Sequence, residues 1–253
     1  MTELAALLFD VDGTLADTER HGHRVAFNRA FADAGLDWEW SHPLYGELLA
    51  VTGGKERIRH YLQQTGEEAG FSEEELDEFV ARLHAAKNEH YKRLLEEGSI
   101  PLRPGIERLL NQARKEGIRL AIATTTTADN VSALLNQTLG PEAESWFEVI
   151  GAGDVVPAKK PAPDIYHYVM EKMGLSPQQC IALEDSVHGF QAASDAGVKT
   201  VVTVNEYTRD GDFSGAALVI DRVGEPKQPF TVLAGDAGGA DHLDVELLRR
   251  LLA

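Results

Sequence analysis

The chain has 253 residues, of which 43% are hydrophobic and 26% charged, a composition typical of a globular protein with a sizeable core. Its formal net charge of −17 argues against binding to nucleic acid or to an anionic membrane, because both attract clustered Lys and Arg. No apolar run approaches the roughly 20 residues that span a bilayer, and we expect no signal peptide. Cys180 is the sole cysteine, which excludes an intramolecular disulfide and favours a cytoplasmic location. Its apolar neighbours predict a buried structural thiol rather than a nucleophile.

The first predicted element is a buried strand over residues 5–9, which ends in two carboxylates, Asp10 and Asp12. Ligands of parallel α/β sheets bind beyond the carboxyl ends of the strands, so Asp10 is a candidate nucleophile and Asp12 a candidate general acid and base. Gly13 permits a tight turn after them, and Thr14 can hydrogen-bond the loop that holds them.

An Asp-x-Asp-Gly sequence is also found in ordinary turns and in calcium loops. The calcium loop is excluded, because the later oxygen ligands and the closing Glu are missing. The ordinary turn remains the alternative, and partner groups at the ends of later strands would decide against it.

Residues 16–97 are predicted to form a helical domain without strands. Apolar residues recur at spacings of three and four up to Gly35, again after Gly53, and most regularly from a capping box at Ser72 to the residue before Gly98. The acidic run after Ser72 is expected to be a solvated first turn that favours the helix dipole.

Strands and helices alternate from residue 101 onward, which predicts a parallel sheet with right-handed crossovers. The expected elements are a helix over 104–116, a strand over 119–123, a helix around 131–135, a strand near 149–150, a helix after Pro163, a strand over 180–183, a helix ending at Gly197, strands over 200–204 and 218–220, a loop over 235–241 and a final amphipathic helix.

The predicted fold class is therefore α/β, a Rossmann-like parallel sheet core with an inserted helical domain. We expect a discontinuous core of residues 1–15 and 98–225, the helical domain of residues 16–97, and a C-terminal loop and helix of residues 226–253.

Two later segments carry polar groups that phosphoryl transfer requires. Thr124 offers a hydroxyl to a phosphoryl oxygen, although at least one of the four consecutive threonines is expected to cap the next helix. Lys160 offers a cation to both Asp10 and the transferring group, with a solvated surface lysine as the alternative. Lys159 beside it is a second candidate for the same role.

Glu184 and Asp185 follow an apolar strand, where carboxylates are unfavourable unless they coordinate something. Together with Asp10 and the backbone carbonyl of Asp12, they form a set of oxygen ligands suited to Mg²⁺. The sequence therefore predicts a magnesium site at the carboxyl edge of the sheet.

The order of these groups resembles the four motifs of the haloacid dehalogenase superfamily, Asp-x-Asp-Gly-Thr, a strand-terminal Thr, Lys-Pro-x-Pro-Asp and Glu-Asp-Ser. The Pro-x-Pro-Asp that follows Lys160 favours this lysine over Lys159. The resemblance implies that the helical insertion is a cap that closes over the substrate. It assigns catalysis to Asp10, Asp12, Thr124 and Lys160, and metal binding to Asp10, Asp12, Glu184 and Asp185.

Within the superfamily, the helical insertion and Lys-Pro-Ala-Pro-Asp-Ile-Tyr resemble the β-phosphoglucomutase group. Residues 17–24, 45–49 and 53–57 are more narrowly similar to the CbbY-type xylulose-1,5-bisphosphate phosphatases of the carbon-fixation cycle. A mutase has its cap histidine four residues after the Thr of Asp-Thr-Glu, whereas here Gly22 stands at that position and His23 follows it. This departure argues against mutase chemistry.

The negative charge of the chain opposes an anionic substrate, so local cations must reverse the potential at the site. Gly53 and Gly54 let a helix N-terminus approach an anion, and Lys55 and Arg57 add positive charge where a second phosphate would bind. An exposed helix start with two solvated cations is the alternative. For Glu19 and His23, which could bind sugar hydroxyls, a surface role is the alternative. The candidate substrate-binding residues are Glu19, His23, Lys55, Arg57 and Thr125.

The resemblance implies that Asp10 attacks phosphorus to form an aspartyl phosphate, while Asp12 protonates the leaving sugar oxygen and then activates water. We expect magnesium-dependent hydrolysis of xylulose 1,5-bisphosphate to xylulose 5-phosphate by a monomer whose partner is a small-molecule sugar phosphate. A β-phosphoglucomutase-like mutase and a catalytically idle sugar-phosphate sensor are the alternatives. A dehalogenase is disfavoured, because Asp12 and the Glu184–Asp185 pair serve phosphoryl chemistry.

Overall fold

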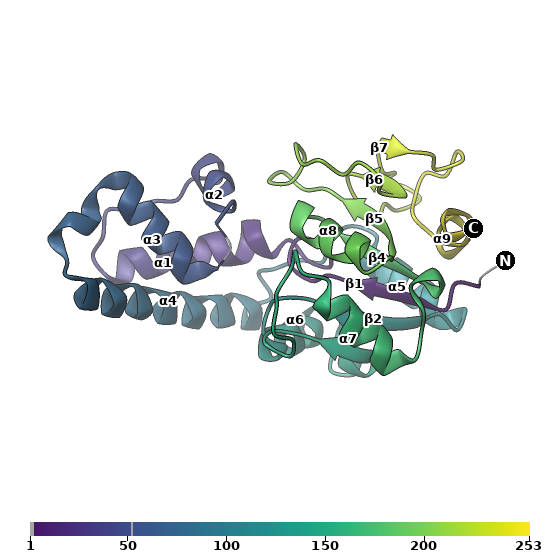
Figure 1. The fold of residues 1–253 in the computed structure, drawn as a ribbon, viewed down its shortest axis with the longest axis horizontal. Coiled ribbons are helices and arrows are strands. Elements are labelled where there is room, and N and C mark those ends of the chain that lie inside the picture. The colour runs from purple at the N-terminus through teal and green to yellow at the C-terminus, as the bar shows by residue number, and fades with distance from the viewer. Residues whose placement is uncertain (1–2, 52) are drawn as a thin grey trace. The chain divides into compact units, whose positions relative to one another are not determined.

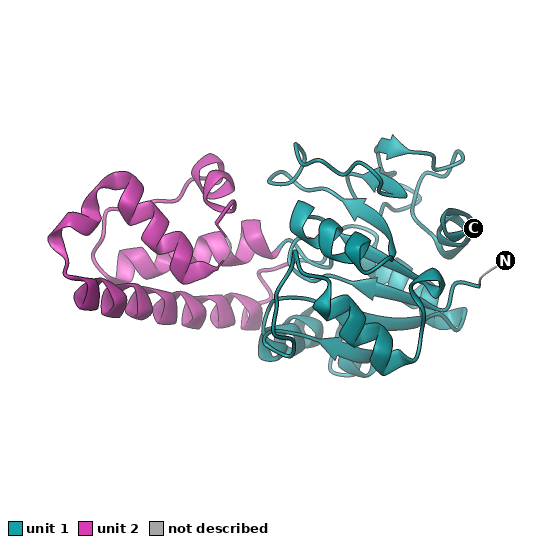
Figure 2. Cartoon of the chain, in the orientation of Figure 1, with its two compact units in different colours: residues 1–17, 101–253 teal, residues 18–100 magenta. Residues whose placement is uncertain are grey.

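The computed structural model describes residues 3–51 and 53–253, which form two compact units (Figure 2). The core unit comprises Met1–Asp17 and Pro101–Ala253, and the helical unit comprises Thr18–Ile100. Residues 16–17 belong to the core unit because Ala16 pairs with Leu102 and the Asp17 N–H donates to the Pro101 carbonyl at 3.2 Å. Residues 98–100 instead continue the helical unit, where the Ser99 N–H donates to the Leu94 carbonyl at 3.0 Å. The boundaries predicted from the sequence lie between residues 15 and 16 and between residues 97 and 98, whereas those of the two units lie between residues 17 and 18 and between residues 100 and 101.

The core unit contains a seven-stranded sheet of order β3-β2-β1-β4-β5-β6-β7 (Figure 1). Strands β1 to β6 are parallel and β7 is antiparallel to β6, so the predicted α/β class with a parallel sheet is confirmed. The strands are β1 (Ala6–Phe9), β2 (Arg119–Ala123), β3 (Phe147–Gly151), β4 (Cys180–Glu184), β5 (Lys199–Thr203), β6 (Leu218–Ile220) and β7 (Val232–Gly235).

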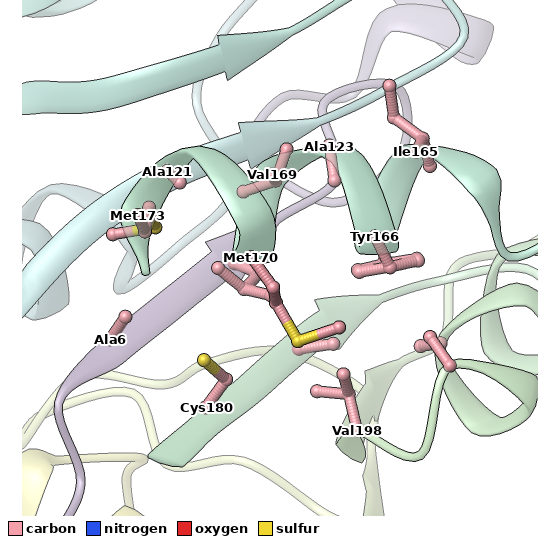
Figure 3. Close-up of a cluster of buried hydrophobic side chains, with 14 of the residues drawn as sticks. Ala6, Ala121, Ala123, Ile165, Tyr166, Val169, Met170, Met173, Cys180 and Val198 are labelled. Atoms are coloured by element: carbon pink, nitrogen blue, oxygen red, sulfur yellow. The ribbon is translucent and has the colours of Figure 1, made fainter. Parts of the chain in front are cut away.

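Helices α7 (Asp164–Met173) and α8 (Val187–Asp195) cover one face of this sheet. Their apolar side chains pack on Ala6 and Leu8 of β1 and on neighbouring residues of β2 and β4 (Figure 3). Cys180 lies in this cluster, and burial raises the pKa of its thiol to about 11, which agrees with a structural thiol. Since successive strand residues face opposite sides, Leu7 and Phe9 point to the other face. The helices of the core unit are α5 (Ile106–Lys115), α6 (Ala128–Leu139), α7 (Asp164–Met173), α8 (Val187–Asp195) and α9 (Val245–Leu252), with the short η3 (Ala143–Trp146) and η4 (Pro177–Gln179).

The strand order places the switch point of the topology at β1. The chain builds β2 and β3 on one side of β1 and β4 to β7 on the other, and ligands bind beyond the carboxyl ends of the strands at such a point. Phe9 is level with Ile122 of β2 and with Leu183 of β4. Asp10 therefore follows β1 at the same height as the last residues of β2 and β4.

The helical unit consists of α1 (Arg24–Asp33), α2 (His42–Leu48), α3 (Gly54–Thr65) and α4 (Glu73–Glu96), with a π-helix η1 (Glu19–His23) and the short η2 (Glu67–Gly70). Its described residues contain no strand, as predicted. The capping box of Ser72 and Glu75 starts α4. Helix α2 is not predicted from the sequence, because it is short and contains Pro43 and Gly46 in place of an apolar stripe.

Two details of the core unit differ from the predicted elements. Helix α5 begins at Ile106 rather than at Pro104, because Gly105 with φ 92° lies outside the helix as its N-cap. Strand β7 lies inside the segment 226–253, which is predicted as a loop and a helix. All four β7 residues are exposed, so no alternation of apolar and polar residues marks the strand in the sequence. Among the residues that the structure describes, no helix is long and apolar enough to cross a membrane.

Candidate active site

Three carboxylates meet at the carboxyl ends of β1 and β4. One oxygen of each of Asp10, Glu184 and Asp185 lies within 4.8 Å of the others. All three residues are buried, and Glu184 is 0% exposed. Like charges so close together in a buried place need cations for their ionised forms to persist.

Lys160 supplies one such cation. Its Nζ donates to Asp10 Oδ1 at 2.7 Å, to Glu184 Oε1 at 2.6 Å and to the Ala123 carbonyl at the end of β2 at 2.8 Å. Lys159 points elsewhere and forms an ion pair with Asp154 at 2.9 Å. The structure thus brings Lys160, and not its neighbour, into the cluster.

The protonation of this cluster follows from burial and from the charges within it. Burial raises the pKa of Asp10 to about 7, Lys160 opposes this rise, and the charges of Glu184 and Asp12 add to it. Burial disfavours the charged form of Lys160, but Asp10 and Glu184 together raise its pKa above the ordinary value. Lys160 is therefore a cation at neutral pH, and any further positive charge beside Asp10 favours its ionised form.

One carboxylate oxygen of Glu184 lacks a hydrogen-bond donor among the described residues. Glu184 Oε1 accepts hydrogen bonds from Lys160 and from the Tyr166 hydroxyl, whereas Oε2 is buried and has no hydrogen-bond partner among the described residues. A buried carboxylate oxygen of this kind is costly unless a cation or a water occupies the space beside it. An all-oxygen donor set of Asp10, Glu184 and Asp185 fits a hard divalent cation such as Mg²⁺. Asp12 is half-buried and outside this group of three, and its metal-binding role stays a prediction.

The loop after β1 packs directly on Asp185. Thr14 Oγ1 donates to Asp185 Oδ1 at 3.4 Å, and Asn205 Nδ2 donates to Asp185 Oδ2 at 2.7 Å. Gly13 has φ 83°, and a Cβ at this position would lie 2.2 Å from Asp185 Oδ2. Both the turn and the close approach therefore require glycine at position 13.

Thr124 follows β2 directly and is buried. Its Oγ1 accepts the Thr126 N–H at 3.3 Å, while Thr127 caps α6 by accepting the Asn130 N–H at 3.4 Å. The expected helix cap is thus Thr127, and Thr124 is left at the strand end beside the Ala123 carbonyl that Lys160 contacts. Thr125 is exposed.

Some residues around the carboxylates are not found by the sequence analysis. Tyr166 of α7 donates its hydroxyl to Glu184, and burial together with the Glu184 charge raises the pKa of that hydroxyl well above its ordinary value. Gly189 of α8 lies so close to Glu184 that a Cβ there would be 1.8 Å from Oε2. A tyrosine and a glycine within helices carry no sequence signal of such contacts.

In the helical unit, the predicted substrate-binding residues have different surroundings. Arg57 is buried and donates to the Leu48 carbonyl at 3.1 Å, the Val51 carbonyl at 3.3 Å and the Tyr45 hydroxyl at 3.1 Å, which gives it a structural role within the unit. The Tyr45 hydroxyl in turn donates to Glu19. Lys55 is exposed at the start of α3.

Two basic side chains of α4 that are not predicted from the sequence, Lys87 and His84, lie beside His23 and beside the start of α3, respectively. Lys87 Nζ is 2.9 Å from His23 Nδ1, and the His23 ring stacks on Tyr91. Burial, with the charges of Lys87 and Lys55, lowers the pKa of His84 to about 4. A Cβ on Gly54 would lie 2.6 Å from His84 Nε2, so glycine allows this imidazole to approach the helix start.

The π-helix η1 changes one argument made from the sequence. A π-helical turn contains one residue more than an α-helical turn, and η1 covers the residues between Thr18 and Arg24. The spacing of a regular α-helix therefore does not apply to the segment that carries Gly22 and His23. The argument against mutase chemistry stays a prediction.

Comparison with known proteins identifies the family. A family model of haloacid dehalogenase-like hydrolases matches residues 4–197. The chain belongs to this family. It is 46% identical over 227 residues to the protein CbbY encoded on a plasmid of Cupriavidus necator, covering 90% of this chain and 89% of that protein.

Solved structures agree with this assignment. A mutant CbbY from Rhodobacter sphaeroides in complex with xylulose-(1,5)bisphosphate matches with a TM-score of 0.74 and 44% identity, covering 87% of this chain and 94% of that chain. A β-phosphoglucomutase from Clostridium difficile matches with a TM-score of 0.66 and 26% identity, covering 88% and 92%. The predicted superfamily, the similarity to CbbY-type proteins and the class of enzyme, a phosphatase of the haloacid dehalogenase type, are confirmed.

Proposed function

We propose that this protein is a magnesium-dependent phosphatase that hydrolyses xylulose 1,5-bisphosphate to xylulose 5-phosphate. The single observation that carries the phosphatase chemistry is the buried cluster in which Lys160 bridges Asp10 and Glu184 beside Asp185. Similarity to CbbY proteins, one of which is described in complex with xylulose-(1,5)bisphosphate, supports the choice of substrate.

Each residue of the core site has a proposed role. Asp10 attacks phosphorus in line and becomes the aspartyl phosphate, while Lys160 and the Thr124 hydroxyl stabilise the charge of the transferring group. Asp12 protonates the departing sugar oxygen and afterwards deprotonates the water that attacks the aspartyl phosphate. Mg²⁺ held by Asp10, Glu184 and Asp185, with the predicted contribution of Asp12, would supply positive charge that offsets the repulsion between Asp10 and the phosphate.

The test of the phosphatase is release of phosphate from a panel of sugar mono- and bisphosphates with Mg²⁺. Asp10→Asn should fold and leave the release of phosphate undetectable, because an amide oxygen cannot form the aspartyl phosphate. Wild-type turnover in this variant would reject Asp10 as the nucleophile. Absence of phosphate release by the wild-type protein from every ester would favour the sugar-phosphate sensor, and an isomeric sugar phosphate in a coupled assay without free phosphate would favour the mutase.

For the helical unit, we propose that Lys55, with Arg57, Glu19 and His23, contributes to binding a bisphosphate, and that Thr125 of the core unit also contacts substrate. Lys55 is the sharpest test, because it is exposed while Arg57 holds its own unit together. Lys55→Ala should raise the KM for xylulose 1,5-bisphosphate about tenfold or more, since a charge-assisted phosphate contact contributes roughly 1.5–3 kcal/mol. The KM for p-nitrophenyl phosphate, which has no second phosphate, should stay unchanged. Equal losses on both substrates would contradict the assignment. A monomeric state and a cytoplasmic location stay predictions.

A further inference from the structure

Arg103 connects three segments at the carboxyl edge of the sheet. It lies between Pro101 and α5, and its backbone N–H donates to the Leu15 carbonyl at 2.9 Å. Its buried guanidinium donates to the Gly13 carbonyl at 2.6 Å, to both the carbonyl and the hydroxyl of Thr203, to the Val204 carbonyl at 2.7 Å and to the Asp221 carbonyl at 2.7 Å. One side chain therefore fixes the loop after β1 against the ends of β5 and β6.

Only a guanidinium suits this arrangement. Its two terminal nitrogens point along the fixed directions of a planar fork and serve acceptors from separate segments at once. A lysine at position 103 would carry a single nitrogen, which could not reach the carbonyls of Gly13 and Asp221 together. Carbonyl groups left without a donor in this buried place would be unfavourable.

Asn205 lies directly after Val204, one of the residues that Arg103 holds. Its Oδ1 accepts the Tyr207 N–H at 2.8 Å, which identifies the other amide atom as the nitrogen. That Nδ2 donates to Asp185 Oδ2 at 2.7 Å. The amide also lies against Gly13, where a Cβ would be 2.9 Å from Nδ2. Gly13, Asp185 and Asn205 thus form one close-packed group, and Arg103 holds it from two sides.

We propose that Arg103 and Asn205 are positioning residues for the magnesium site, an inference that rests on the proposed function. Asn205 orients the Asp185 carboxylate by a direct hydrogen bond, and Arg103 fixes the backbone of the Gly13 loop relative to the β5 end that carries Asn205. Partners that orient a metal-binding carboxylate typically change metal affinity 10-fold to 100-fold when they are removed.

The experiment measures Mg²⁺ binding to the full chain by isothermal titration calorimetry for Asn205→Ala and Arg103→Lys. Each variant has a matched control elsewhere in the core unit. Gln191 Nε2 donates to Asp195 Oδ1 at the same 2.7 Å, so Gln191→Ala removes an amide–carboxylate hydrogen bond away from the site. Arg108 donates to the carbonyls of Gly224 and Leu243 at 2.9 and 2.8 Å, so Arg108→Lys removes guanidinium–carbonyl contacts.

We expect the Kd for Mg²⁺ to rise about tenfold or more in Asn205→Ala and Arg103→Lys, and to stay unchanged in both controls. At saturating Mg²⁺, Asn205→Ala should recover the wild-type KM for p-nitrophenyl phosphate. An unchanged Kd in Asn205→Ala would overturn the role of Asn205. An unchanged Kd in Arg103→Lys would overturn the role of Arg103, whatever the thermal stability of the variant. If Arg103→Lys fails to fold, Thr203→Val removes the hydroxyl that Arg103 contacts at 3.0 Å, and an unchanged Kd in that variant would overturn the role of Arg103.

Failure of the proposed function gives a different result. A wild-type protein that binds Mg²⁺ but releases no phosphate from any ester would reject the phosphatase, while the calorimetric comparison would still support or reject the two positioning residues. A wild-type protein that does not bind Mg²⁺ in the calorimeter would overturn the inference itself.

Discussion

The glycine at position 189 offers a direct test of how tightly the buried carboxylate is held. Gly189 lies in the first turn of α8 with ordinary helical φ, so alanine there meets no backbone strain and gains about 1 kcal/mol of helix propensity. Its Cβ, however, would lie 1.8 Å from Oε2 and 2.3 Å from Cδ of Glu184. Glu184 is fully buried and held by Lys160 and Tyr166, so it cannot swing into solvent.

The two effects oppose each other, and the clash is the larger. Overpacking of a buried site costs about 1–3 kcal/mol. A contact of 1.8 Å with a side chain that cannot move away belongs in the upper part of that range, about 2–3 kcal/mol, of which the gain in helix propensity offsets about 1 kcal/mol. We expect Gly189→Ala to be less stable by about 1–2 kcal/mol. For a chain of this length, that corresponds to a Tm lower by roughly 2–8 °C. Displacement of Glu184 also moves Lys160 and Asp10, and a misplacement of about 1 Å at the reacting groups lowers kcat about 100-fold.

Differential scanning calorimetry and phosphate release check this prediction together. Gly70→Ala is the matched control, because a Cβ at that exposed glycine meets no atom within 4 Å. In a Glu184→Ala background the clash partner is absent, so Gly189→Ala should there cost no stability, although activity stays low. A Gly189→Ala variant with the Tm and kcat of the wild-type protein would refute the packing argument.

Two further predictions concern charges. Lys160→Met should be less stable by about 3–5 kcal/mol in urea unfolding, because it leaves Asp10 and Glu184 buried without their cation, and an unchanged midpoint would contradict the arrangement. The pKa of His84 is lowered to about 4 by burial and by Lys87 and Lys55, so between about pH 6.5 and pH 4 the unfolded chain binds a proton that the folded imidazole does not. As the pH falls from about 6.5 to 4, the free energy of unfolding should therefore decrease by about 1–2 kcal/mol, allowing for partial exposure of the ring. His84→Gln should lack this decrease, and an equal decrease in both proteins would show that the imidazole is not its cause.

The sequence predicts the parts of the site that sit at strand ends. Asp10 and Thr124 directly follow apolar strands and Glu184 is the last residue of one, and the parallel register of β1, β2 and β4 brings such residues to one edge of the sheet. Lys160 comes from a loop, and only its Pro-x-Pro-Asp context distinguishes it from Lys159. Local pattern and sheet topology are therefore enough for the carboxylate cluster and its lysine.

The supporting residues are not predictable in this way, because their contacts join segments far apart in the chain. Arg103 is 90 residues from Gly13 and 100 from Thr203, and its partners are backbone carbonyls that any residue type carries. The π-helix η1 is likewise not predictable from the sequence, because the spacing of apolar residues does not specify the hydrogen-bond pattern of a single turn. Strand β7 is missed because its residues are exposed, so no buried face marks it.

The negative charge of the site explains why its carboxylates need so many hydrogen-bond donors around them. With Asp10, Glu184 and Asp185 ionised, the cluster carries three negative charges and Lys160 carries one positive charge, which leaves 3 − 1 = 2 negative charges to be balanced. A phosphate ester brings roughly two more, so the cluster with Lys160 alone would repel its substrate. A divalent cation would bring the cluster to neutrality, and the net charge of −17 gives the chain no long-range attraction for an anionic substrate. The hydrogen bonds from Thr14, Asn205 and Tyr166 have a common effect, because each holds a carboxylate of a cluster whose members repel one another.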